Sequence, residues 1–147
     1  MKFVAMVTRT LKEGKTYDDY RKAWFHTTGF GIPTTMYTII NAFNPREIIS
    51  IGILDGELID LYSALEIDVK DRLSNPLDDV IESTIVRNFG VVAAIDDFSP
   101  KGELTYIPAA VDGKPTDYNA MSVVLEQIAA EIKKASHKRD QLKKSNN

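Results

Sequence analysis

The order of strand-type and helix-type segments constrains the fold of these 147 residues more than any other feature of the sequence. Residues 3–10 combine an apolar run with alternation, which predicts a strand. Thr16 then has the side chain and the position to cap a helix by accepting the amide hydrogen of Asp19. We expect this helix to continue to about Thr28, because Gly29 follows and glycine is typical of helix ends.

Strand-type and helix-type segments also alternate in the middle of the chain. Asn75-Pro76 resembles a cap followed by a first helical residue, and it separates two segments that both look helical. Residues 58–64 follow the turn dipeptide Asp55-Gly56 and fit either a hairpin return strand or a continuation past a bulge. The predicted segments are strands at 35–43 and 48–54, helices at 65–73 and 76–89, and a strand at 91–95. The strand at 48–54 is almost wholly apolar, so we expect both of its faces to be covered.

The last third of the chain is an addition to this pattern. Residues 103–111 predict a further strand, and Pro108 within it indicates an edge strand or an arm. A helix is expected from about residues 117–119, with one narrow apolar seam that docks on the body or on a partner chain. The seam consists of Met121, Leu125, Ile128, Ile132 and Ala135. We therefore divide the domain into a core, residues 1–98, and a C-terminal extension, residues 99–147.

The core order strand, helix, strand, strand, helix, strand is the βαββαβ pattern of an α+β, ferredoxin-like fold. Such a fold has an antiparallel sheet with helices on one face. The second, third and fourth predicted strands carry few charges, so the other face would be apolar as well. An uncovered apolar face of that size favours association. We therefore expect a homodimer with twofold symmetry, in which the two sheets pack against each other.

Composition excludes several kinds of chemistry. The chain has no cysteine, which excludes disulfides, thiolate metal sites and cysteine nucleophiles. Its two histidines are far apart, and it contains no glycine-rich nucleotide loop and no GxSxG motif, so we predict neither a metal nor a cofactor. No apolar stretch approaches the length of a membrane span, and the N-terminus has no signal-peptide layout. We expect a soluble, cytoplasmic protein without a membrane partner.

Charge is divided unevenly along the chain. Residues 133–147 carry a net charge of +5, whereas the remainder carries −8. The basic end fits either an anion-binding segment or lysines that complement the dipole of a helix C-terminus. The basic end has no aromatic side chain to stack on bases, and the acidic body would repel phosphate. We therefore predict no nucleic-acid partner.

Residues 16–26 read Thr-Tyr-Asp-Asp-Tyr-Arg-Lys-Ala-Trp-Phe-His and resemble the first helix of EthD-like proteins. These belong to the dimeric α+β barrel superfamily, together with antibiotic-biosynthesis monooxygenase-like proteins. Asp55-Gly56 with residues 61–65 resembles their mid-domain segment, and the resemblance spans residues 2–98. It implies a cavity between helices and sheet or inside the dimer barrel. It also implies a metal-free oxygenase, isomerase or cyclase acting on an aromatic or polycyclic small molecule.

Two residues are candidates for catalysis. His26 has an imidazole with a pKa suited to a general base. At about 100° per helical residue it lies opposite Trp24, so an imidazole exposed to solvent is the alternative. Asn41, in the predicted second strand, would orient a substrate carbonyl if it faced a cavity, and would have no such role at an edge of the sheet.

Three residues are candidates for ligand binding. Arg9 lies late in the first strand, where a sheet interior would require a partner carboxylate such as Asp96 or Asp97, or an anionic ligand. At the end of the strand it would lie in water instead. Trp24 and Tyr37 belong to an early cluster of aromatic residues that either lines a pocket for a flat ligand or forms ordinary core.

These candidates leave two functions open. Convergence of Arg9, His26 and Asn41 on one cavity would support an enzyme. Divergence would favour a non-catalytic protein that binds a small molecule or serves as an oligomeric structural component.

Overall fold

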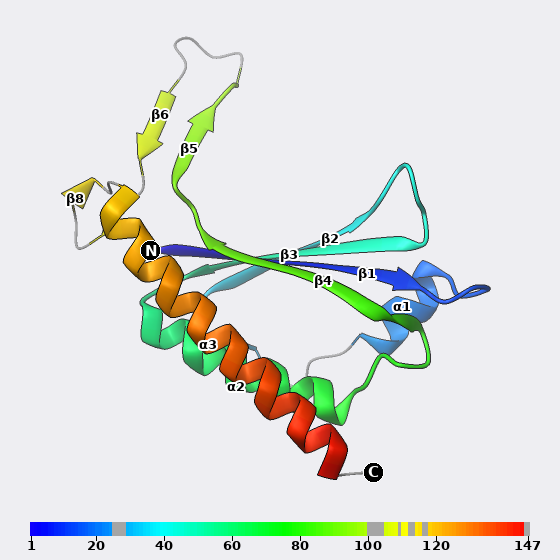
Figure 1. Ribbon diagram of the computed structural model, residues 1–147. Coiled ribbons are helices and arrows are strands. Elements are labelled where there is room, and N and C mark those ends of the chain that lie inside the picture. The colour runs from blue at the N-terminus through cyan, green and yellow to red at the C-terminus, as the bar shows by residue number, and fades with distance from the viewer. Residues whose placement is uncertain (25–28, 100–104, 109, 112–113, 116–117, 146–147) are drawn as a thin grey trace.

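The chain folds as an α+β protein in which helices pack on one face of a four-stranded antiparallel sheet (Figure 1). The computed structural model describes residues 1–24, 29–99, 105–108, 110–111, 114–115 and 118–145. Its elements are β1 (Lys2–Leu11), α1 (Tyr17–Ala23), β2 (Thr34–Ile40), β3 (Glu47–Asp55), α2 (Leu58–Ser74), β4 (Ile81–Val91), β5 (Ala94–Asp97), β6 (Thr105–Pro108), β7 (Ala110–Val111), β8 (Lys114–Pro115) and α3 (Tyr118–Ser145).

The sheet has the strand order β2-β3-β1-β4, with every neighbouring pair antiparallel. β1 pairs with β3 on one side and with β4 on the other, so that Val7 lies opposite both Ser50 and Arg87. The predicted strands at 3–10 and 48–54 are confirmed, and the second strand ends at Ile40, short of residue 43. β3 is buried on alternate residues, so within one chain only its helix-facing side is fully covered.

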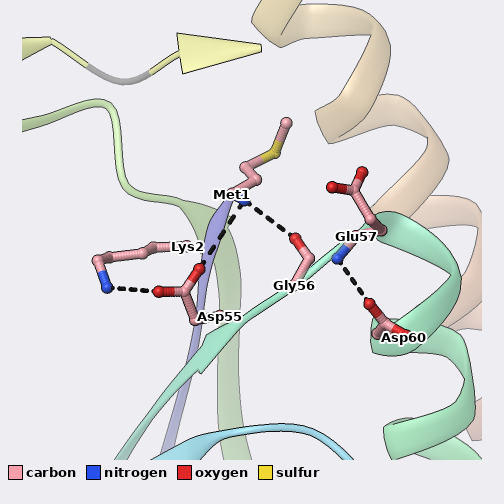
Figure 2. Close-up of polar contacts among 6 residues, drawn as sticks. All are labelled: Met1, Lys2, Asp55, Gly56, Glu57 and Asp60. Atoms are coloured by element: carbon pink, nitrogen blue, oxygen red, sulfur yellow. Dashed lines mark hydrogen bonds and ion pairs between the residues drawn. The ribbon is translucent and has the colours of Figure 1, made fainter. Parts of the chain in front are cut away.

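Residues 58–64 are helical, so both strand interpretations of this segment are wrong. They form the first part of α2, which begins directly after β3. The Glu57 amide donates to the Asp60 carboxylate at 2.7 Å, which satisfies a backbone donor at the start of the helix (Figure 2).

Beside the start of this helix, the Met1 amino group donates to the Gly56 carbonyl at 3.0 Å, and Lys2 Nζ lies 2.8 Å from Asp55. The hydrogen bond from Lys2 holds the pKa of Asp55 below its ordinary value.

The predicted helix over 76–89 is wrong, because most of this segment belongs to β4. Ile81, Ile85 and Phe89 are spaced by four, which fits one face of a helix and, being even, also one face of a strand. Pairing with β1 decides between the two, since this edge of β1 takes its backbone hydrogen bonds from residues 81–91.

The start of α1 is confirmed. Thr16 Oγ1 accepts the Asp19 amide at 3.3 Å, and the Asp19 carboxylate accepts the Thr16 amide at 2.8 Å. These bonds to Thr16 hold the pKa of Asp19 below its ordinary value. The helix ends at Ala23 with Trp24 in an extended conformation, earlier than expected, and residues 25–28 lie outside the described part of the chain.

Of the C-terminal additions, the short strands lie apart from the four-stranded sheet and the helix α3 packs on it. β5 and β6 form a two-stranded arm that projects from the end of β4 (Figure 1), and Pro108 pairs with Ala94 there, as expected of an arm. α3 starts where predicted and lies beside α2 on the same face of the sheet. Ile128 of α3 is buried in a cluster with Phe3, Leu54 and Leu61, so the apolar seam docks on the body. Within the described residues, no helix is long and apolar enough to cross a membrane.

Truncation of Ile128 tests whether α3 belongs to the cooperative core. Ile128→Ala should lower the free energy of unfolding by about 2–4 kcal/mol, because the side chain is 2% exposed. Val123→Ala on the same helix, at 55% exposure, should cost under about 1 kcal/mol. Urea unfolding measures both variants. Equal effects would show that α3 is not docked as part of the core.

Candidate functional site

A cavity of about 400 Å³ lies between the helix-facing side of the sheet and α2, with the C-terminal end of α3 along its border. β1, β3 and β4 supply its floor through alternate residues, because successive side chains of a strand point to opposite faces. Apolar and charged side chains both line it. Their positions follow from the register of the sheet.

One end of the cavity is apolar. Ala5 lies opposite Gly52 on β3 and Phe89 on β4, and Met36 of β2 pairs with Gly52. A Cβ on Gly52 would lie 3.1 Å from the Met36 side chain, so glycine leaves room for that side chain. From α2, Leu61, Ala64 and Leu65 face the same space.

The other end of the cavity carries the charged groups. Two residues further along β1, Val7 lies between Ser50 and Arg87, and Arg9 follows on the same face. One to three turns further along α2, Asp68 and Arg72 join Val69 and Leu73 in the lining. α3 contributes Arg139, Asp140 and Lys143. The cavity is therefore amphipathic along its length.

Arg9 is buried and is held by hydroxyl groups. Its Nη1 donates to Tyr20 Oη and to Ser50 Oγ, both at 3.4 Å, and the two hydroxyl oxygens lie 3.4 Å from each other. Asp96 and Asp97, the carboxylates expected to partner Arg9, lie in β5 on the projecting arm, and Asp97 instead accepts the Ser99 amide. The expected ion pair is therefore wrong, and Arg9 has neutral partners.

The other guanidinium groups of this end are partly desolvated. Burial lowers the pKa of Arg87, and the neighbouring Arg139 and Arg9 lower it further, while Asp68 acts in the opposite direction. Burial also lowers the pKa of Arg72, while the charge of Asp68 raises it and the charge of Arg9 lowers it further. Arginine nevertheless stays protonated in proteins. The downward shifts therefore come first from the loss of hydration, to which like charges add at Arg87, and an anion there would stabilise both guanidinium groups.

Trp24 connects α1 to this charged end. The guanidinium carbon of Arg72 lies 5.7 Å from the centroid of the indole ring, and that of Arg21 lies 5.4 Å away. These distances suit cation–π attraction. Since Trp24 also lines the cavity, it positions Arg72 and offers an aromatic surface to an occupant.

The structure brings together only some of the residues that the sequence singles out. Arg9 and Trp24 line the same cavity. Tyr37 alternates with cavity residues along β2, so it points to the opposite face of the sheet and is 55% exposed. Asn41 lies in the turn before β3, where Nδ2 donates to Glu47 at 2.7 Å and Oδ1 accepts the Phe43 amide. His26 lies outside the described residues.

Sequence reasoning missed Arg72, Arg87 and Arg139. Recognising β4 as a strand would have placed Ile85, Arg87 and Phe89 on one face, which is the signal for a charge facing inward among apolar residues. Arg139 was hidden among the lysines of the basic C-terminal segment.

Among the residues that the structure describes, no group of three or more histidine, aspartate or glutamate side chains could hold a metal ion. Comparison of the chain with protein-family models, curated proteins and solved structures found no match in any of the three. The geometry itself is therefore what bears on function: a partly open cavity with an apolar end and with the buried Arg9 and the half-buried Arg72, Arg87 and Arg139 at its other end.

Removal of the Tyr20 hydroxyl tests the support of Arg9. Tyr20→Phe should lower the free energy of unfolding by about 1 kcal/mol, because Arg9 and Ser50 each lose a buried partner. Tyr17→Phe is the matched control, since Tyr17 is only half-buried and lies in the same helix. Chemical denaturation of both variants gives the comparison. If Tyr20→Phe is as stable as Tyr17→Phe, these hydroxyl contacts contribute nothing.

Proposed function

We propose that the chain is a small-molecule-binding protein whose cavity takes an apolar or aromatic molecule bearing an acidic group. The observation that carries this function is the division of the cavity into an apolar end and an end with Arg9, Arg72 and Arg87. Pockets for small molecules are mostly apolar with a few placed polar groups that fix orientation. Guanidinium groups bind carboxylate and phosphate in a planar, bidentate manner.

Binding alone is better supported than catalysis. The two catalytic candidates do not support an enzyme together, because Asn41 is bound to Glu47 outside the cavity and His26 lies outside the described residues. An oxygenase, isomerase or cyclase reaction would need a proton acceptor or donor at the cavity. The carboxylate at the cavity that acts on both Arg72 and Arg87 is Asp68, whose charge raises the pKa values of these two cations. The resemblance of residues 2–98 to EthD-like proteins stays a prediction.

We also propose that the core is ferredoxin-like and dimerises as a dimeric α+β barrel. The strand order β2-β3-β1-β4 with helices on one face supports the first part. The uncovered face supports the second part, since its central positions contain no charged residue. These positions are Val4, Met6, Thr8, Thr35, Tyr37, Ile39, Ile49, Ile51, Ile53, Val86, Asn88 and Gly90. A second copy of the sheet would remove this surface from water.

Calorimetry with 2-naphthoate and the neutral 2-naphthol tests the binding function. We expect 2-naphthoate to bind at least about 10-fold more tightly, because a carboxylate paired with a guanidinium gains about 1.5–3 kcal/mol. Arg87→Gln should remove most of this preference, whereas Lys133→Gln, on the exposed side of α3, should leave it unchanged. Failure of 2-naphthoate to bind better than 2-naphthol would contradict an acid-binding cavity.

Sedimentation velocity with a charged substitution tests the dimer. At micromolar concentration we expect a dimer, and Val86→Glu should weaken it at least about 100-fold, since burying an unpaired carboxylate costs several kcal/mol. Val86 is 53% exposed in the protomer, so the fold should tolerate the change. Ile59→Glu, at a 67% exposed site on α2, should leave the dimer intact. A monomeric unsubstituted protein would count against the barrel.

A further inference from the structure

We propose that the acidic group bound at the charged end is a phosphate monoester, and that Arg139 of the C-terminal helix completes its site. This inference rests on the proposed function and specifies the class of ligand. Its basis is the convergence of Arg9 from β1, Arg87 from β4 and Arg139 from α3 on one end of one cavity.

The number of available donors favours phosphate over carboxylate. Within the part of the chain that the structure describes, the hydrogen bonds of Arg9 use Nη1 alone. Within the described residues, no hydrogen bond or ion pair is made by the Arg87 guanidinium. Arg139 Nε is buried without a hydrogen bond there and ion-pairs with the adjacent Asp140 at 3.5 Å. In bidentate geometry three such groups offer about six N–H donors, whereas a carboxylate has about four lone-pair sites. A phosphate ester has three terminal oxygens and accommodates all three guanidinium groups.

The charge at this end also favours a dianion. Four guanidinium groups gather there: Arg9, Arg72, Arg87 and Arg139. The lining also includes Asp78, Glu82 and Lys143, of which Asp78 pairs with Lys143 at 3.9 Å and Glu82 with Arg46 at 2.7 Å. The four guanidinium groups then face Asp68, Asp71 and Asp140, which leaves an excess of one positive charge. Asp140 is 61% exposed, and water screens its charge more than that of the less exposed guanidinium groups, so the effective excess is greater than one. A phosphate monoester carries a charge of about −1.5 to −2 near neutral pH, which compensates this excess better than a single negative charge does.

The opposite end of the cavity argues for an ester rather than free phosphate. Ala5, Met36 and Leu61 line a volume that a free ion leaves empty. Transfer of an apolar group into that volume is favourable in proportion to the apolar surface that it removes from water. The occupant expected from both ends together is the phosphate ester of an apolar or aromatic alcohol.

Calorimetry with four ligands that share one ring tests the inference: 2-naphthyl phosphate, 2-naphthyl sulfate, 2-naphthoate and 2-naphthol. The sulfate matches the phosphate in shape but carries one charge. We expect the phosphate to bind at least about 10-fold more tightly than the sulfate and the carboxylate. Its affinity should also rise roughly 10-fold between about pH 5 and pH 7.5, as the second proton of the ester, with a pKa of about 6, is lost.

The carboxylate ligand is the control for the pH series. His137 lies two residues from Arg139, and Asp68, Asp78, Glu82 and Asp140 line the same cavity as the guanidinium groups. Titration of these protein groups would change 2-naphthoate binding as well, so only a rise confined to the phosphate ester supports the inference.

Two results overturn the inference and leave the proposed function standing. The first is 2-naphthoate or the sulfate binding as tightly as the phosphate. The second is a phosphate affinity with no pH dependence beyond that of 2-naphthoate. Inorganic phosphate at the affinity of the ester would overturn it too, because the apolar end would then contribute nothing. If no charged ligand binds better than 2-naphthol, the proposed function itself fails.

Substitutions on α3 test the part assigned to Arg139. Arg139→Gln should reduce the preference for 2-naphthyl phosphate over 2-naphthoate at least about 5-fold. Lys133→Gln removes the same charge from the same helix at an exposed position and should leave the preference unchanged. Circular dichroism and urea unfolding confirm that both variants fold. An unchanged preference in folded Arg139→Gln would exclude α3 from the site.

Discussion

The pairing of β1 with strands on both of its sides is the constraint on which the rest of the structure depends. β3 and β4 are both antiparallel to β1, and the two registers place Ser50 and Arg87 opposite the same residue, Val7. A slip of one residue in either pairing would turn the slipped strand over and move its inward-facing side chain to the uncovered face. The apolar residues Phe3 and Leu11, near the two ends of the strand, oppose such a slip because both are buried against the helices.

The predictable parts of the fold are those with a local physical cause. The cap of α1 is specified by Thr16 and Asp19, three residues apart, and β1 and β3 by their own apolar content. β4 depends on a non-local cause, since residues spaced by four suit either structure and only the free edge of β1 selects the strand. The prediction for residues 58–64 was wrong for a related reason, because their short apolar run has no periodicity that distinguishes a strand from a helix. The contact of Asp60 with the Glu57 amide at the start of the helix was also not recognised.

The candidate site was predictable where one side chain is unusual for its element, and not where several elements meet. Arg9 is a charge within an apolar strand, which is visible in the sequence, and the structure places it in the cavity with Trp24. Arg87 and Arg139 become informative only once β4 and α3 are brought together. Net charge is uninformative for the same reason, because the acid excess of residues 1–132 does not describe the local charge of a cavity whose lining holds four arginines and four carboxylates.

The proposed binding and the proposed assembly use opposite faces of the sheet, which differ at the level of single residues. Val86 points to the uncovered face and Arg87 to the cavity, just as Met6 and Val7 do on the neighbouring strand. Each strand therefore serves both surfaces, and its alternation keeps their chemistry distinct: uncharged on one side, amphipathic on the other. A substitution at one position of a strand therefore changes the side chains on one face of the sheet and leaves those on the other face unchanged. The proposed ligand binding and the proposed dimerisation therefore depend on different residues of one sheet, and each can be tested without disturbing the other.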